Sequence, residues 1–169
     1  GSWVNGELIG PGEFQCEQYT YTINIINSEL SETTTTLNTI SIKYTNGDYY
    51  NGQCSGSLNQ ITLHGYGCYT TTIPTISTFE GHFMNNMRHG LGKSIERGYT
   101  WEGYWVNDNM HGVIKVSRAN GESYCGMYVD GQRHGSGVFT TADGDVADEV
   151  YCEHKLVSSV RRVKAIIKT

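Results

Sequence analysis

The chain of 169 residues has only 2 prolines, and it lacks several features that mark common classes of protein. No hydrophobic run approaches the roughly 18 residues of a transmembrane helix, and no stretch has the apolar core of a secretory signal peptide. The formal net charge is −5, so the chain has no basic footprint for nucleic acid. We therefore expect neither a membrane-spanning protein nor a nucleic-acid partner.

Recognisable catalytic motifs are also missing. The sequence contains no nucleophile elbow, phosphate-binding loop or metalloprotease helix. Its histidines recur at equivalent positions of a repeated unit, which favours a structural role over membership of a single catalytic centre. We predict that the chain is not an enzyme and uses no cofactor.

Cysteine occurs 5 times without a Cys-x-x-Cys pair, and no Asn-x-Ser/Thr sequon is present. Scattered cysteines in odd number are typical of reduced thiols, so we expect a cytoplasmic protein, associated with the cytoskeleton or with a membrane. Cys152 and His154 form the best metal candidate because they lie in the irregular end of the chain. Alone they supply only part of the ligand set that zinc needs, and we assign no metal.

Glycine (21 residues) and tyrosine (12 residues) are abundant, and they stand in a repeated unit. Each unit opens with aromatic-x-Gly-x-aromatic and reaches His-Gly ten residues after the first aromatic. The best copies are Phe79-x-Gly81-x-Phe83 with His89-Gly90, Trp101-x-Gly103-x-Trp105 with His111-Gly112, and Tyr124-x-Gly126-x-Tyr128 with His134-Gly135. A fixed period of 22 or 23 residues indicates a repeat architecture.

Each unit is predicted to be a β-hairpin. In a strand, Tyr124, Gly126 and Tyr128 face the same side, and the glycine leaves room for a ring from the neighbouring unit. The strand then meets Asp130-Gly131, a pair that tolerates the left-handed backbone of a tight turn. A single hairpin is marginal in water, so the units must stack side by side.

These units divide the chain into a sheet over residues 1–154 and a basic capping segment over residues 155–169. Within the sheet we predict a half repeat over 3–14, a degenerate repeat over 19–43, repeats over 44–72, 79–98, 101–121 and 124–144, and a decayed repeat over 145–154. The His-Gly of repeat 44–72 comes four residues late, which predicts a longer hairpin tip. The chain begins partway through a repeat, as a fragment of a longer protein would.

The capping segment is predicted to be helical. Its apolar residues have helical spacing at Val157, Val160, Val163 and Ile167. A cap of this kind would cover an edge strand that otherwise invites aggregation. An alternative role is contact with anionic lipid through Arg161, Arg162, Lys164 and Lys168.

The aromatic-x-Gly-x-aromatic…His-Gly-x-Gly unit resembles the MORN repeat (membrane occupation and recognition nexus). The resemblance is tight over 79–145, good with an insertion over 44–70, partial over 3–14, and poor over 15–43 and 147–169. It implies an all-β fold, an elongated single-layer antiparallel sheet of stacked β-hairpins with a grooved aromatic face. It also implies use as a scaffold in cytoskeletal structures, cilia and membrane junctions, or beside an enzyme domain.

The aromatic row is the candidate partner-binding groove, formed by Tyr50, Phe79, Phe83, Trp101, Trp105, Tyr124 and Tyr128. The competing interpretation is a core in which the rings pack on one another. Since a single-layer sheet cannot hide one face under a second layer, part of the row should stay accessible to a helix or peptide.

We therefore predict a non-enzymatic scaffold or adaptor. It would bind a protein partner, cytoskeletal by resemblance, through the groove, or associate with itself as a homodimer. One alternative is a peripheral membrane tether that binds anionic phospholipids. Another is an accessory module of an enzyme whose catalytic domain lies outside this chain.

The repeated histidines His64, His89, His111 and His134 have the same two interpretations, ligands or structural residues. Equivalent atoms of successive repeats should lie about 9–10 Å apart, because each repeat adds two strands. That distance is too long for a shared metal. We predict hydrogen bonds to neighbouring backbone instead.

Overall fold

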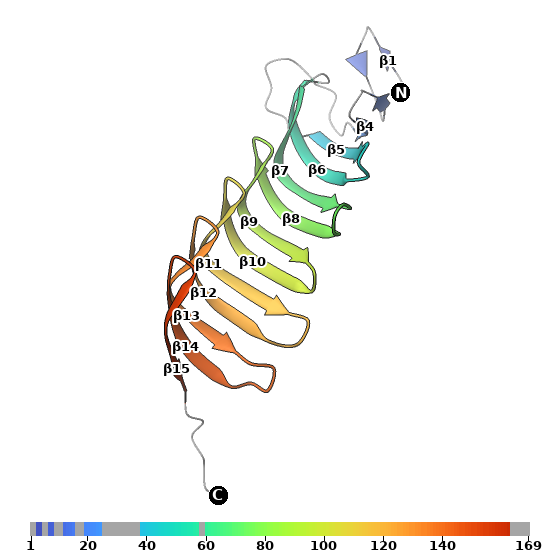
Figure 1. Cartoon of the computed structure of the whole chain (residues 1–169). Helices are drawn as coiled ribbons and strands as arrows, with labels where there is room; N and C mark the ends of the chain where they lie inside the picture. The colour runs from blue at the N-terminus through green and yellow to red at the C-terminus, as the bar shows by residue number, and fades with distance from the viewer. Residues whose placement is uncertain are drawn as a thin grey trace, which may run out of the picture.

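The computed structural model describes residues 3–4, 7–8, 12–15, 19–24, 38–57 and 60–162, with side chains over 39–56 and 61–162. It consists of one 13-stranded antiparallel sheet, β3 to β15 in chain order, and a separate two-stranded sheet of β1 and β2 (Figure 1). The described residues include no helix. The predicted all-β, single-layer antiparallel sheet of stacked hairpins is confirmed.

The short strands of the N-terminal part are β1 (Trp3–Val4), β2 (Glu7–Leu8), β3 (Gly12–Gln15), β4 (Tyr19–Asn24) and β5 (Asn38–Tyr44). The central strands are β6 (Tyr49–Ser57), β7 (Gln60–Thr71), β8 (Ser77–Met84), β9 (Met87–Glu96) and β10 (Tyr99–Val106). The remaining strands are β11 (Asn109–Arg118), β12 (Ser123–Val129), β13 (Gln132–Thr140), β14 (Val146–Cys152) and β15 (Lys155–Arg161).

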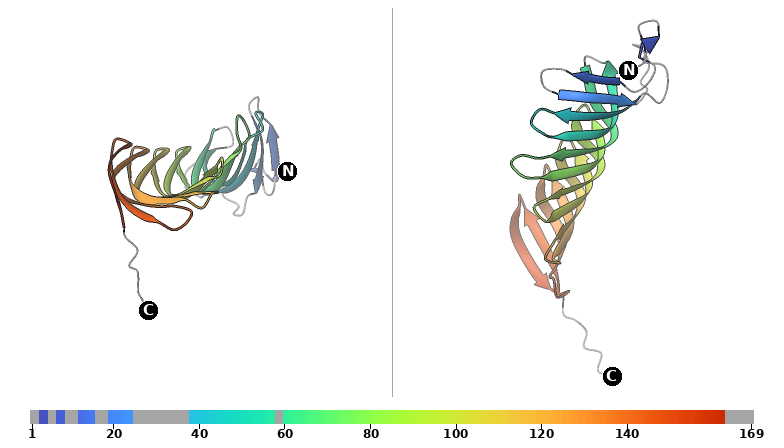
Figure 2. Two further views of the ribbon diagram at one scale, coloured as in Figure 1. Left: turned by 60° about the horizontal axis from the view of Figure 1, so that its bottom comes forward. Right: turned by 90° about the vertical axis from the view of Figure 1, so that its right-hand side faces the viewer.

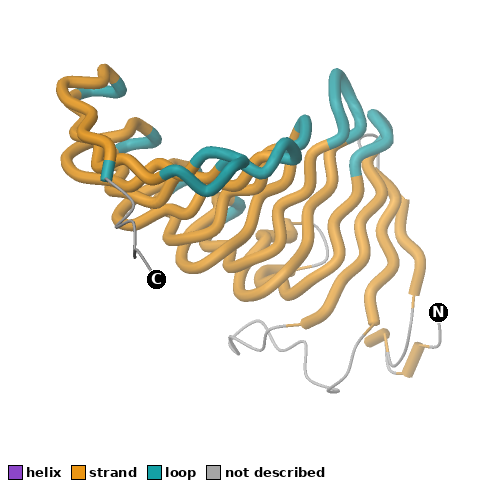
Figure 3. Tube along the Cα trace, turned by 90° about the horizontal axis from the view of Figure 1, so that it is seen from below, coloured by secondary structure: helices purple, strands orange, loops and turns teal. Residues whose placement is uncertain are grey.

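The sheet is curved and twisted. Its strands curl across the width, so that the sheet resembles a trough (Figure 2). Seen from below, successive curled strands follow one another like ribs along the length (Figure 3). The twist is the ordinary consequence of strand chirality, and the curl gives the single layer an inner and an outer face.

Left-handed two-residue turns join the two strands of each hairpin along one edge of the sheet. They are Asn85-Asn86 (φ 52 and 67), Asn107-Asp108 (φ 46 and 68), Asp130-Gly131 (φ 48 and 78) and Glu153-His154 (φ 45 and 64). Positive φ at both positions matches the right-handed twist of the strands that such a turn connects. The polar turn predicted at Asp130-Gly131 is confirmed, and the other three turns repeat its left-handed backbone.

Each of these turns is bonded to the preceding hairpin. The second turn residue donates its backbone N–H to a carbonyl of the unit before it: Asn86 to Leu63 (3.0 Å), Asp108 to Arg88 (3.0 Å), Gly131 to Met110 (2.9 Å) and His154 to Arg133 (2.9 Å). The hairpins are therefore linked beyond the strand ladder, since the turns themselves make backbone bonds that a free hairpin would leave to water.

The His-Gly pair forms a bulge rather than the turn itself. Gly81 pairs with Gly92 and Phe83 with Arg88, so β9 contains two more residues than β8 between these pairs. Gly90 lies within the bulge at a φ of 98°. A side chain is disfavoured at such a φ, which explains why glycine follows histidine in the motif.

The longer hairpin predicted for residues 44–72 is present. β6 and β7 pair from Tyr49↔Thr70 to Ser57↔Gln60, and the bulge again lies beside Gly52. The additional residues extend the two strands. The tip, residues 58–59, lies outside the described residues.

The predicted C-terminal helix is wrong over its described half. Lys155–Arg161 is strand β15, and it pairs with β14 from Cys152↔Lys155 to Ala147↔Arg161. Two features favour a strand here: the open hydrogen-bonding edge of β14, and β-branched Val157 and Val160. The hairpin pattern therefore continues past residue 154. Val163 and Ile167 lie outside the described residues.

Candidate partner-binding groove

The seven aromatic residues of the predicted groove lie on one face of the sheet. Tyr50, Phe79, Phe83, Trp105, Tyr124 and Tyr128 are buried, and Trp101 is half-buried. Their rings meet edge to face, with centroids 5.3 Å apart for Phe79–Phe83 and for Phe79–Trp105, and 5.4 Å for Tyr50–Phe83. Such pairs contribute about 0.5–1.5 kcal/mol beyond area burial. The row is thus the core of the sheet, and a partner would meet the less buried side chains around it.

The repeated spacing of ring and glycine has a direct structural cause within one hairpin. A Cβ added to Gly92 would lie 2.6 Å from Cε2 of Phe79, and one added to Gly137 would lie 2.6 Å from Cε2 of Tyr124. The ring therefore lies over the glycine two residues along its own strand and over that glycine's cross-strand partner.

Our prediction that the covering ring comes from the neighbouring unit is wrong. The first aromatic of a hairpin covers its own glycines because it leans along its own strand. Tyr50 follows the same rule over Gly52 and Gly67.

The hairpin of Trp101 departs from this arrangement. Ile114 pairs with Gly103 where β7, β9 and β13 have a second glycine, and it is fully buried. Trp101 stacks on Tyr99 instead, with centroids 5.4 Å apart and planes 14° apart. The core divides here into two clusters, both of which contact Trp101 and Met110. Trp101 is therefore the member of the row that stays partly accessible.

A groove with a volume of about 490 Å³ lies on the aromatic face. Its lining is Tyr44, Leu63, Tyr69, Thr71, Ser77, Phe79, Phe83, Asn86, Arg88, Ser94 and Asp108. The lining combines buried rings with hydroxyl, amide and charged groups, which is the usual composition of a binding site. Of the seven predicted residues, Phe79 and Phe83 line this groove.

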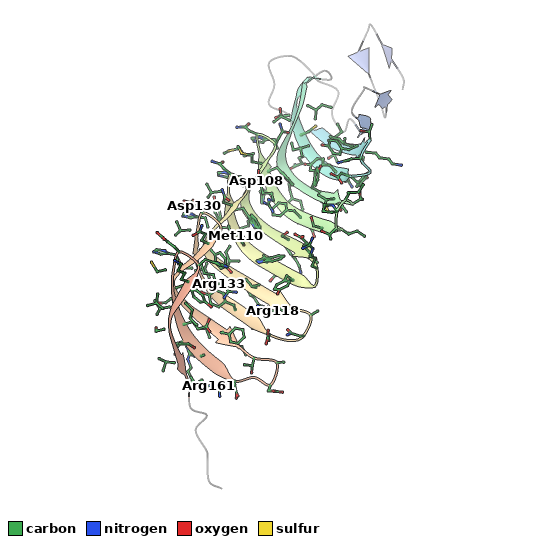
Figure 4. All side chains as sticks on the ribbon, in the orientation of Figure 1. Asp108, Met110, Arg118, Asp130, Arg133 and Arg161 are labelled. Carbon is green, nitrogen blue, oxygen red and sulfur yellow. The ribbon has the colours of Figure 1, made fainter. Side chains whose placement is uncertain are left out.

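Arginine side chains cover the rings of the aromatic face. The Arg88 guanidinium lies 4.2 Å from the Trp105 ring centroid, and its Nε is 3.0 Å from Oδ1 of Asp108. The carboxylate fixes the arginine and the ring favours its charge. Figure 4 shows Asp108 near the hairpin tips and Arg133 over the strands of the following hairpin.

Arg133 repeats the contact. Its guanidinium lies 4.3 Å from the Tyr124 ring centroid and 5.0 Å from that of Tyr151. It also donates to the Tyr151 hydroxyl at 2.8 Å. We did not predict these arginines. The available signal was an arginine directly before the histidine in two repeats, Arg88-His89 and Arg133-His134.

Asp48 holds Tyr69, which lines the groove. It accepts hydrogen bonds from the backbone N–H of Thr72 (2.9 Å), the side chain of Asn46 (2.9 Å) and the hydroxyl of Tyr69 (3.2 Å). Burial alone would raise the pKa of this carboxyl, but these donors outweigh it and hold the pKa below its usual value. Burial first, and then nearby Tyr44 and Asp48, raise the pKa of Tyr69. Tyr69 is thus held in the groove wall as a neutral phenol.

The repeated histidines form no ladder of ligands. Nδ1 of His89 lies 3.3 Å from the side-chain oxygen of Asn107, so this histidine meets a side chain rather than the predicted backbone. Within the described ranges, no three His, Cys, Asp or Glu residues are grouped to hold a metal. Cys152 and His154 are exposed beside the last turn. Cys54, Cys68, Cys125 and Cys152 are free thiols, and burial raises the pKa of Cys54 to about 11.

The predicted lipid contacts are not equivalent. Arg161 is exposed at the end of β15. Arg162 forms a two-pronged ion pair with Asp148, at 2.9 and 2.5 Å, so its charge is already compensated. Lys164 and Lys168 lie outside the described residues. The described part of the chain has no helix that could cross a bilayer.

The MORN-repeat family model matches residues 1–21, 79–95, 101–113 and 124–146. The chain is a MORN-repeat protein. Within the described hairpins, the matched segments start at Phe79, Trp101 and Tyr124, which open the aromatic-x-Gly-x-aromatic motifs in β8, β10 and β12. MORN repeats generally mediate binding and are typically non-catalytic. No curated protein sequence matches this MORN-repeat chain.

Proposed function

We propose that this MORN-repeat protein is a non-enzymatic scaffold that binds a helix or extended peptide of another protein in the groove. The supporting observation is the groove itself, about 490 Å³ in volume, with rings at its floor and polar groups around them. A peptide could place apolar side chains on the rings and pair its polar groups with Asn86, Arg88 and Asp108. A cytoskeletal partner, suggested by the family resemblance, and a cytoplasmic location, suggested by the scattered cysteines, belong to the same proposal.

Rigidity supports the scaffold role. Arg88 is held by both Asp108 and the Trp105 ring, and Tyr69 is held by Asp48. Side chains fixed before binding lose little conformational entropy when a partner arrives. Lipid tethering has weaker support, because Arg162 is paired with Asp148.

The proposal can be tested with a groove-filling substitution. Ser77 lines the groove at the start of β8, and Ser77→Tyr would place a ring in it. Peptides selected from a displayed library against the wild-type chain should bind Ser77→Tyr at least ~10-fold more weakly, about 1.4 kcal/mol, by calorimetry.

Ser117→Tyr is the matched control, because Ser117 lies in β11 next to inward-facing Val116 and points to the opposite face. Equal circular dichroism and melting temperature establish that both variants are folded. If the selected peptides bind Ser77→Tyr as tightly as the wild type, the groove is not the binding site and the proposal is wrong.

A further inference from the structure

The outer face, opposite the aromatic row, has an exposed apolar stripe. It comprises Tyr66 (48% exposed), Leu91 (65%), Tyr104 (44%), Val113 (60%), Met127 (41%) and Val150 (39%). Leu91 is the register partner of Tyr104, and Val113 is that of Met127. The four central residues therefore cross the successive strands β9 to β12. Tyr66 on β7 and Val150 on β14 continue the line along the sheet beyond their register partners His82 and Ser136. We call these six residues the outer stripe. Exposed apolar side chains that gather on one face in this way mark an interaction site.

A row of charges lies beside the outer stripe on the same face. Register pairing places Glu80 next to Lys93, Lys93 next to Glu102, and Glu102 next to Lys115. All four are on neighbouring strands β8 to β11, about 4.8 Å apart. Lys93 Nζ is 3.0 Å from Glu102 Oε1, and the two side chains are 47% and 42% exposed. We call these four residues the charged row.

The order of signs in the charged row is self-complementary. The row reads acid, base, acid, base, and reversed it reads base, acid, base, acid. If a copy is turned by a twofold axis between Lys93 and Glu102, parallel to the strands, each charge meets its opposite. Glu80 then faces Lys115 of the second copy, and Lys93 faces Glu102 of the second copy. Isologous dimers require such a self-complementary surface.

The same axis brings the two outer stripes together. Strands β9 and β10 exchange places across it, so Leu91 faces Tyr104 of the second copy. The curl of the sheet makes one face convex across its width (Figure 2). The groove hollows the aromatic face, so the outer face is the convex one. Two troughs placed back to back touch along their length, and the outer stripe runs in that direction.

We propose that the outer face is the interface between two copies of this chain, related by a twofold axis between Lys93 and Glu102. The partner class is thus a second copy, recognised by alternating charge and covered apolar surface. A bilayer of anionic lipid fits less well, because Glu80 and Glu102 would face like charge. The interface goes beyond the proposed scaffold function, since the groove lies on the other face and remains open in the dimer.

A charge-swap experiment tests the interface. Lys93→Glu with Lys115→Glu makes the charged row wholly acidic, and Glu80→Lys with Glu102→Lys makes it wholly basic. By sedimentation equilibrium, the wild type should dimerise, and each variant alone should dimerise at least ~10-fold more weakly because like charges face each other. An equimolar mixture of the two variants should restore a dimer that contains one copy of each, identified by native mass spectrometry.

Lys43→Glu with Lys155→Glu is the control, because it makes the same change in net charge outside the charged row. This variant should dimerise like the wild type, and circular dichroism should show all variants folded. The inference is overturned if the wild type is monomeric at ~100 µM. It is equally overturned if the mixture stays monomeric, or if both row variants dimerise as tightly as the wild type.

Discussion

Gly92→Ala tests the packing of an aromatic ring over glycine. The added Cβ would lie 2.6 Å from Cε2 of Phe79 and closer still to Cζ. Carbon atoms in contact are normally about 3.5–4.0 Å apart, so the ring must retreat by about 1 Å or more. Phe83 and Trp105 block that movement, since both rings have their centroids 5.3 Å from that of Phe79.

The expected loss of stability is large for one methyl group. Overpacking of a core costs about 1–3 kcal/mol, and the blocked ring places Gly92→Ala near the upper end, about 3 kcal/mol. That is a substantial part of the ~5–15 kcal/mol by which a domain is usually stable. Urea unfolding, followed by tryptophan fluorescence, measures the change as a lower midpoint at an unaltered slope.

Two further variants isolate the cause. Gly112→Ala should cost only ~1–2 kcal/mol, because Gly112 has a φ of 75° and nothing within 4 Å of an added Cβ. Phe79→Leu replaces the ring with a shorter side chain. The double variant Phe79→Leu with Gly92→Ala should therefore lose less stability than the sum of the two single losses, by ~1 kcal/mol or more. Additive costs, or a cost for Gly92→Ala no greater than for Gly112→Ala, would refute the ring-over-glycine account.

The other predictions concern hydroxyl groups and pH. Tyr124→Phe should be neutral or stabilise by up to ~1 kcal/mol, because this buried hydroxyl has no partner. Tyr50→Phe should destabilise by ~1 kcal/mol, because its hydroxyl donates to a backbone carbonyl at 2.6 Å. Urea unfolding measures the stability of both variants. A Tyr124→Phe variant less stable than Tyr50→Phe would contradict this account of the two hydroxyl groups. Asp48 has a folded-state pKa below its usual value of 3.8. The stability that the ionised Asp48 carboxylate contributes is therefore present above pH 3.8 and is lost as pH falls through the folded-state pKa. Melting temperatures between about pH 5 and pH 2 should fall less steeply for Asp48→Asn than for wild type; equal slopes contradict the prediction.

The turns and strands were predictable because short-range chemistry decides them. Asn85-Asn86 and Asp130-Gly131 adopt a left-handed backbone because these residue types tolerate it. The repeat period then places the strands between the turns. The same local logic failed at the C-terminus. Val157 and Val160 fit a helical spacing, but the open edge of β14 was available and the segment paired with it as a strand.

The candidate site was harder to predict because it depends on distances between hairpins. The aromatic residues were identified, but their sequence does not state which atoms they cover or how deeply they are buried. Arg88 and Arg133 act through rings on other strands, and the groove is lined by residues of several hairpins. Ile114 is an irregularity within the repeat that changes the core, and its effect on Trp101 depends on the register of β10 and β11.

The order of the strands also bears on how the protein is made. Every neighbour in the long sheet is also a neighbour in the chain, so no strand waits for a distant segment to be translated. A nascent hairpin can dock on the edge formed just before it, and its turn bonds to that earlier hairpin. Growth is therefore directional, from the first hairpin to the last, and the number of repeats translated sets the length of the sheet.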